Sequence, residues 1–132
     1  MNHSTLCICI GADVHLDEIV LCVVDKADGH EVIEHFRVTN NLPGAQAAAT
    51  AIAETATRLG CTHIEIGWEA TGMLWIPFHR YLSTCPQLQS FELELVCFNP
   101  QLVTKFKDGL VLRRPKNDKL SASAIAARLR FG

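Results

Sequence analysis

The sequence predicts an α/β domain: a mixed sheet of three antiparallel strands, followed by helices and strands in alternation. Three short runs rich in Ile, Val and Leu, joined by brief links, come first, and helical stretches then alternate with single strand-like runs. The chain has 132 residues, of which 48% are hydrophobic and 20% are charged. This length suits one domain with a substantial core, and the composition excludes disordered and collagen-like classes.

The first half is expected to form an antiparallel meander and one helix. Strands are expected at 5–12, 18–25 and 30–38. Turn residues Ala27-Asp28-Gly29 separate the second strand from the third. After an N-cap near Asn40 and an early proline, the Ala-rich stretch 44–59 is expected to be a helix that Gly60 ends.

The second half is expected to alternate. We expect a strand at 62–68, a helix at 72–83 capped by Thr71, a loop at 86–90 and a strand at 93–98. Beyond Asn99-Pro100 we expect a short basic helical stretch, a mobile basic connection at 107–116 and a last helix at 117–130.

The six cysteines form no CxxC pair, and most lie in or beside apolar runs: Cys7, Cys9, Cys22, Cys61, Cys85 and Cys97. We interpret them as reduced thiols of a cytoplasmic protein. A metal pair at Cys7 and Cys9, which share a strand face, remains the alternative. Because the apolar runs are short and no basic residue precedes the first one, neither a signal peptide nor a membrane span is expected.

Charge is distributed unevenly along the chain. Residues 1–100 hold four basic and twelve acidic residues, a net charge of −8, whereas residues 101–132 hold eight basic and two acidic residues, a net charge of +6. The basic end either meets a polyanion such as nucleic acid or is a solvated helix face. Its first basic cluster comprises Lys105, Lys107, Arg113, Arg114, Lys116 and Lys119. Only Phe106 interrupts this cluster with an aromatic ring, so base stacking is not expected there.

Two acids follow strands in matching contexts. Asp13 comes where the first strand runs out and Glu69 follows the fourth, each with a glycine two residues earlier that would leave open space beside the carboxylate. Acids at the strand ends of an α/β sheet occupy the edge where ligands bind, and a divalent cation would neutralise their repulsion. Alternatively, Asp13 only ends a strand, and Glu69 only lies near a helix N-terminus, where the helix dipole favours a negative charge.

Asp118 and Ser121 lie one helical turn apart at the expected start of the last helix. Asp118 either joins the two earlier acids at the sheet edge or is an ordinary acid in the first turn of a helix, after Asn117 as its cap.

Taken together, these features resemble a known family, the N-terminal domain of DEDD-type insertion-sequence transposases, which are bridge-RNA-guided DNA recombinases. The order and spacing of several motifs carry the resemblance: Gly11-Ala12-Asp13-Val14-His15, Thr39-Asn40, Trp68-Glu69-Ala70-Thr71-Gly72, Asn99-Pro100, Lys116-Asn117-Asp118-Lys119-Leu120-Ser121-Ala122, Ile125-Ala126 and Leu129. The resemblance implies a ribonuclease H-like (RuvC-like) fold and a site that binds Mg²⁺ or Mn²⁺.

In this family pattern the first three acids fall on Asp13, Glu69 and Asp118, which would hold the metal. The fourth position, normally an Asp, is Ser121 here. A hydroxyl is a poorer Mg²⁺ ligand than a carboxylate, so we expect weakened metal binding, and a vestigial, inactive site is the competing explanation. His15, two residues beyond Asp13, could reach the site but is interpreted as an exposed turn residue. Trp68, Trp75 and Phe78 are interpreted as packing around Glu69.

The resemblance also implies partners: DNA, a guide RNA, further copies of the protein, and a second, C-terminal domain that supplies a serine nucleophile. We expect a single RuvC-like domain over 1–132, a fragment without that serine, which does not carry out strand transfer alone. Other functions considered are a Holliday-junction-type nuclease that acts without a guide and a domain that only binds RNA or a partner subunit. An actin-like or sugar-kinase ATPase is disfavoured because the Gly-rich phosphate loops are missing.

Overall fold

A computed structural model describes residues 6–70, 72–99 and 121–131. The described elements are β1 (Cys7–Val14), β2 (Glu18–Asp25), β3 (Glu31–Thr39), α1 (Leu42–Leu59), β4 (His63–Glu69), α2 (Ile76–Thr84), the 3₁₀ turn η1 (Pro86–Leu88), β5 (Glu92–Phe98) and α4 (Ala122–Phe131). In this part of the chain, no helix is long and apolar enough to cross a membrane.

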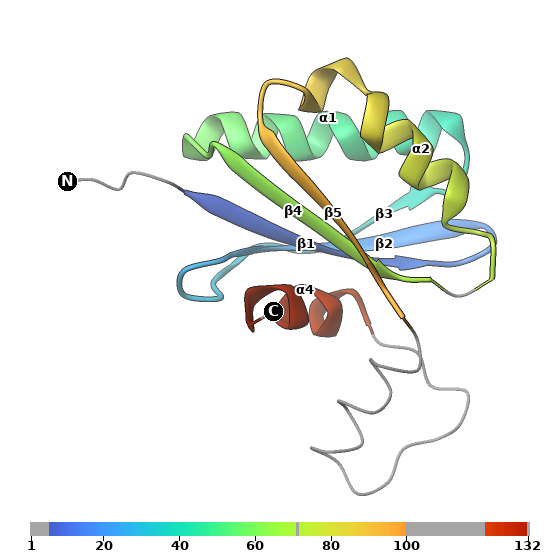
Figure 1. Cartoon of the computed structure of the whole chain (residues 1–132), viewed down its shortest axis with the longest axis horizontal. Helices are drawn as coiled ribbons and strands as arrows, with labels where there is room; N and C mark the ends of the chain where they lie inside the picture. Colours follow the sequence, from blue (N-terminus) through green and yellow to red (C-terminus); the bar gives the residue numbers. More distant parts are fainter. Residues whose placement is uncertain (1–5, 71, 100–120, 132) are drawn as a thin grey trace, which may run out of the picture.

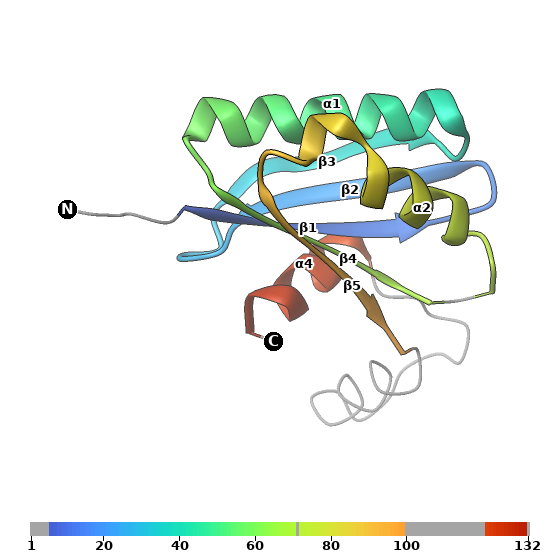
Figure 2. The ribbon, with the colours of Figure 1, turned by 45° about the horizontal axis from the view of Figure 1, so that its top comes forward.

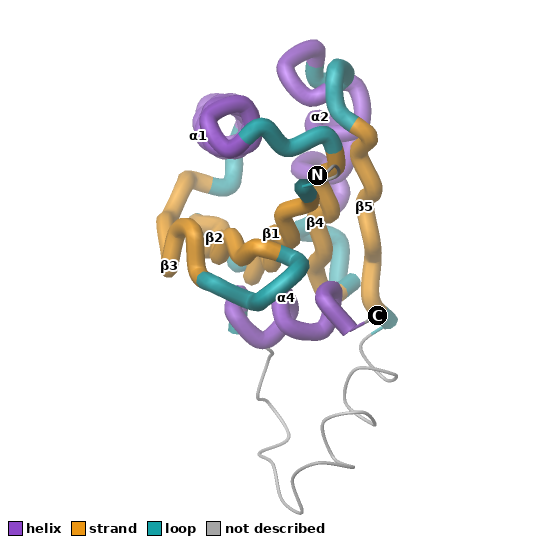
Figure 3. Tube along the Cα trace, turned by 90° about the vertical axis from the view of Figure 1, so that its left-hand side faces the viewer, coloured by secondary structure: helices purple, strands orange, loops and turns teal. Residues whose placement is uncertain are grey.

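The strands form one mixed sheet with the order β3-β2-β1-β4-β5. The first three strands pair antiparallel as a meander, and β4 and β5 then add in parallel beside β1. Helices α1 and α2 cover one face and α4 covers the other, which gives three layers (Figures 1 and 3). The predicted mixed α/β sheet is therefore confirmed.

The larger core lies between the sheet and α1. Alternate residues of β1 and β4, such as Ile8, Ile10 and Ile66, point to this side and are fully buried. Figure 2 shows α1 lying along this face. Small alanines on α1, among them Ala48 and Ala49, let the helix approach the sheet closely. A smaller apolar cluster packs α4 against the opposite face.

The ends of α1 follow the sequence signals. The Asn41 side chain accepts a hydrogen bond from the Gly44 amide at 2.9 Å, which caps the helix start. At the other end Gly60 has a φ of 72° and donates to the carbonyls of the last turn, as predicted. The helix begins at Leu42, slightly before the expected residue 44, because Pro43 fits its first turn.

The other main differences from the prediction concern the strands that carry the acids, the start of α2 and the segment after α2. Strand β1 extends through Asp13 to Val14, because both residues still pair with β2. Strand β4 likewise includes Glu69, which pairs with Phe98 of β5, so both acids lie within their strands and do not follow them. Helix α2 begins at Ile76 and not at 72, since Gly72 has a φ of 62°, which a right-handed helix does not accommodate. The expected loop 86–90 starts with one 3₁₀ turn. Thr71, Asn117 and the predicted elements between 100 and 120 lie outside the described residues.

Candidate active site

Asp13 and Glu69 occupy matched positions on two neighbouring parallel strands. The register of β1 and β4 pairs Cys9 with Glu65 and Gly11 with Gly67, and the two acids follow two residues later on each strand. Side chains alternate along a strand, so both acids share the face of these glycines, which is the α4 face. Neighbouring strands lie about 4.8 Å apart. The two carboxylates therefore come from adjacent strands at one edge of the sheet.

Both acids are largely shielded from water. The Asp13 side chain is 16% exposed and Glu69 is 8% exposed. The Nε2 atom of His15 lies 2.9 Å from Oδ2 of Asp13. His15 lies in the turn between β1 and β2, half-exposed at 43%, and it also reaches the candidate site, which was the alternative to the exposed-turn interpretation. Its ring helps to fix the orientation of the Asp13 carboxylate.

Gly11 does not leave open space beside Asp13, so this part of the sequence prediction is wrong. A Cβ atom on Gly11 would lie 1.9 Å from the carbonyl oxygen of Ala122 and 2.6 Å from the amide nitrogen of Ala126. The backbone of α4 occupies that space. A Cβ on Gly67 would likewise meet the side chains of Phe98 and Leu129 at 3.0–3.2 Å. The glycines serve to let α4 pack directly on the sheet.

The close approach at Gly11 fixes the direction of α4. Its first residue, Ala122, packs over Gly11 near the carboxyl end of β1, whereas Arg130 near its other end donates to the carbonyls of Lys26 and Ala27 at the opposite end of the sheet. Helix α4 therefore begins at the same edge that carries Asp13 and Glu69. Figure 1 shows α4 crossing beneath the strands in this way.

Ser121 lies directly before α4 and is exposed. Its Oγ accepts a hydrogen bond from the Ala124 amide at 3.2 Å and lies 3.1 Å from Oγ of Ser123. The hydroxyl at the fourth position of the family pattern thus caps the helix start. An aspartate is also a good helix cap, so this position accepts either residue.

Asp118 and the six basic residues of the predicted nucleic-acid cluster lie outside the described residues: Lys105, Lys107, Arg113, Arg114, Lys116 and Lys119. Within residues 6–70, 72–99 and 121–131, no group of three His, Cys, Asp or Glu side chains is arranged to hold a metal ion. Asp118, the third acid of the family pattern, therefore cannot be compared in position with Asp13 and Glu69.

Comparison with known proteins then identifies the family. Residues 10–132 match the family model DEDD_Tnp_IS110, whose description is transposase. The chain belongs to this transposase family. The match spans nearly the whole chain and includes all four residues of the predicted acidic site. A search of curated proteins found no match.

Solved structures similar to this transposase domain include RuvC of T. thermophilus in complex with a Holliday junction substrate, with 10% identity, a TM-score of 0.53, and coverage of 94% of this chain and 93% of that one. RNase H1 of Halobacterium salinarum has 17% identity, a TM-score of 0.42, and coverage of 75% and 89%. The RuvC similarity confirms the predicted RuvC-like fold.

Asn40 lies next to the candidate site and makes contacts that the sequence did not reveal. Its side-chain amide donates to the carbonyl of His15 at 2.8 Å and to that of Leu74 at 3.3 Å, and its backbone amide donates to the carbonyl of Asp17 at 3.0 Å. One residue therefore ties the turn after Asp13 to the turn that follows Glu69. A backbone-directed role of this kind leaves no pattern in a single sequence.

The aromatic residues around Glu69 pack on the opposite side of β4. Trp68 is fully buried, and its ring centroid lies 6.1 Å from that of Trp75 and 6.3 Å from that of Phe78. The interpretation of these three residues as core packing is confirmed. His79 also belongs to the cluster, at 5.5 Å from the Trp68 ring, and was not anticipated.

All six cysteines lie in the described part of the chain and are free. Cys7 and Cys9 share the α4 face, as predicted, and their sulfur atoms lie 3.8 and 3.6 Å from the Glu65 carboxylate. A hydrogen bond from Cys9 lowers the pKa of the Cys7 thiol, and the same bond together with burial raises the pKa of Cys9. Glu65 is already paired with Lys26 at 2.9 Å.

Proposed function

We propose that this chain is the metal-dependent catalytic domain of a DNA transposase or recombinase, in which Asp13, Glu69 and Asp118 hold Mg²⁺ or Mn²⁺. The observation that carries the proposal is the matched position of Asp13 and Glu69 on adjacent strands. Carboxylate oxygens are the ligands that these hard cations prefer. The start of α4 at the same edge supports the inclusion of Asp118, which precedes that helix by a few residues.

When bound, the ion would polarise a phosphodiester oxygen and orient the attacking group. The chain's own residues have separate tasks. Asp13 and Glu69 supply negative charge at a shielded edge of the sheet, and His15 holds one oxygen of Asp13. Asn40 keeps the two turns that follow the acids in a fixed relation.

The six basic residues from Lys105 to Lys119 would contact the phosphates of DNA or of a guide RNA without reading sequence. We therefore expect nucleic-acid affinity that falls steeply as salt rises, and an affinity independent of salt would contradict this assignment. The family resemblance extends the proposal to a guide RNA, to a homo-oligomer and to a cytoplasmic location. Because the proposed serine nucleophile belongs to a further domain, the 132-residue chain should not catalyse strand transfer alone, and strand transfer by this chain would refute that statement.

The test of the metal site is calorimetric titration with Mn²⁺. We expect Asp13→Asn to weaken Mn²⁺ binding at least about tenfold. Loss of a residue that only supports a metal ligand already costs about 10–100-fold in affinity, so loss of a ligand itself should cost no less. Ser121→Asp should tighten binding, because it adds a carboxylate and preserves the helix cap. Asp17→Asn, an exposed carboxylate in the turn after β1, is the matched control and should leave binding unchanged.

Two outcomes would contradict the proposal. One is equal binding by Asp13→Asn and Asp17→Asn, and the other is no binding by Ser121→Asp. Either would favour the second candidate function, a vestigial domain that only binds RNA or a partner. The observation in its favour is that the Ser121 hydroxyl already serves as a helix cap. Metal-dependent cleavage of branched DNA by the chain alone would instead favour a stand-alone junction nuclease.

A further inference from the structure

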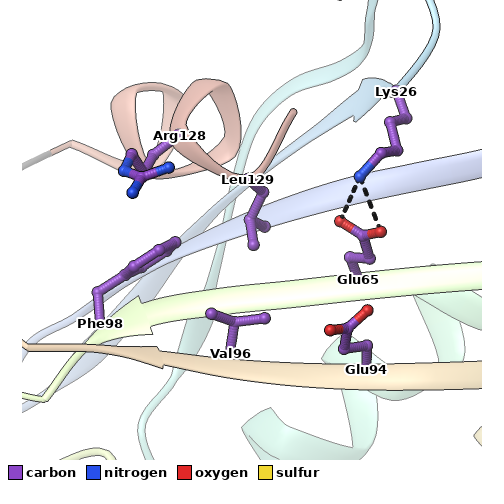
Figure 4. A pocket seen from close by; sticks show the side chains of 7 residues that line it. All are labelled: Lys26, Glu65, Glu94, Val96, Phe98, Arg128 and Leu129. Carbon is purple, nitrogen blue, oxygen red and sulfur yellow. Dashed lines mark hydrogen bonds and ion pairs between the residues drawn. The ribbon is translucent and has the colours of Figure 1, made fainter. Parts of the chain in front are cut away.

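A pocket of about 260 Å³ lies between α4 and β5, on the face of the sheet that carries Asp13 and Glu69. Figure 4 shows the residues that line it, Lys26, Glu65, Glu94, Val96, Phe98, Arg128 and Leu129. The volume is below the roughly 300–1,000 Å³ of pockets that enclose drug-sized ligands. It therefore suits one small flat group better than an extended ligand.

One end of the pocket adjoins the candidate active site. Phe98 pairs with Glu69 in the register of β4 and β5, so the ring lies on the strand next to that carboxylate. The guanidinium carbon of Arg128 lies 5.7 Å from the centroid of the Phe98 ring. Figure 4 shows both side chains at the same end of the pocket. An aromatic ring thus lies on the strand beside Glu69, and a planar cation lies next to that ring.

The other end of the pocket has a different character. There the Lys26 ammonium is neutralised by both oxygens of Glu65, at 2.9 and 3.0 Å, and the exposed Glu94 adds negative charge. Glu94 and Phe98 are four residues apart on β5, roughly 13 Å at 3.3 Å per residue. The negative charge therefore disfavours a phosphate at this end of the pocket.

We propose that this pocket receives an unpaired nucleobase of the strand bound at the candidate acids. The base stacks at Phe98, and an adjacent phosphate is bound by Arg128. This inference rests on the proposed nucleic-acid function of the domain. Stacking on an aromatic ring tolerates any base, and a guanidinium both stacks on rings and binds phosphate. Val96 and Leu129 supply the apolar middle of the pocket.

The test uses the 132-residue chain and a short single-stranded DNA that contains 2-aminopurine, whose fluorescence falls when it stacks. The parent chain should quench the probe. Phe98→Leu should abolish the quenching and bind about tenfold more weakly without changing the salt dependence, whereas Phe98→Tyr should behave like the parent. Arg128→Gln should reduce the slope of log affinity against log salt by about 1. Arg58→Gln, an exposed arginine on α1 on the opposite face, is the control for charge alone and should retain the quenching.

Unchanged quenching and affinity in Phe98→Leu would overturn the inference and leave the proposed function intact. If the Phe98 variants melt at a lower temperature by circular dichroism, Arg128→Gln decides, because Arg128 is only partly buried. Quenching by Arg128→Gln with an unchanged salt slope would then overturn the phosphate contact. Absence of any binding by the parent chain at low salt would contradict both this inference and the proposed nucleic-acid function.

Discussion

Replacement of Gly11 by alanine tests how α4 is held at the candidate site. The added Cβ would lie 1.9 Å from the Ala122 carbonyl oxygen and 2.6 Å from the Ala126 amide nitrogen. Both neighbours are backbone atoms of one helix, so no side-chain rotation relieves the collision and the whole helix must move. Gly11 is not among the glycines with positive φ, which means that alanine brings no backbone strain of its own.

The expected loss of stability follows from that geometry. Overpacking of a filled interior costs about 1–3 kcal/mol, and two backbone contacts put Gly11→Ala near the upper end, at about 2–3 kcal/mol. Complete detachment of α4 from the sheet would be the largest loss of stability that the substitution could cause. It would expose Ile125 and Leu129, each worth about 1.5–3 kcal/mol when buried. Urea denaturation followed by circular dichroism measures the loss.

Two further measurements make the result specific. Cys9 and Cys22 are buried beneath α4, so their reaction with a thiol reagent under native conditions should accelerate in Gly11→Ala. Gly67→Ala is the matched control, because its Cβ would meet only side chains, at 3.0–3.2 Å, which can adjust. If Gly11→Ala is as stable as the parent and both thiols stay protected, the close docking of α4 on β1 is refuted.

Three other predictions concern the connections around this core. Asn40→Asp replaces a donor to two carbonyls by a carboxylate and should reduce the free energy of unfolding by about 1–3 kcal/mol in urea, while an unchanged value would exclude the tie between the two turns. Arg130→Lys cannot keep both hydrogen bonds to the β2–β3 turn, so amide exchange in the last turn of α4 should speed up, and unaltered exchange would contradict the role of the guanidinium. Cys7 should begin to react with iodoacetamide at a lower pH than Cys97, because the hydrogen bond from Cys9 lowers the pKa of Cys7 and burial raises the pKa of Cys97. Reaction of Cys97 at the lower pH would contradict the hydrogen bond between Cys9 and Cys7.

Much of the fold was predictable because local signals agree with it. Turn residues, alternating apolar runs and the cap at Gly60 gave the meander, α1 and the two later strands close to their observed bounds. The start of α2 was missed because the motif at Gly72 looks like a helix beginning, whereas its positive φ belongs to a turn. A positive φ is a property of the folded backbone and is not visible in the residue type alone.

The candidate site was predictable only in part. The acids at 13 and 69 stood out because each comes at the end of an apolar run, two residues after a glycine, and their matched register follows from parallel pairing. The purpose of Gly11 was misread, since the sequence does not reveal that a helix more than a hundred residues later packs on it. The contacts of Asn40 and the pairing of Phe98 with Arg128 are likewise long-range and leave no local pattern.

The most direct test of the central claim is to locate a bound Mn²⁺ ion by its paramagnetic broadening of amide signals in the NMR spectrum of the chain. The account predicts strong broadening around Asp13, Glu69 and the start of α4 at Ala122. Signals at the opposite end of the sheet, near Asp25 and Gly60, should stay sharp. Broadening centred on other acids, such as Glu31 and Glu34 of β3, with none at Asp13 and Glu69, would contradict the assignment of these strand-end carboxylates as the metal site.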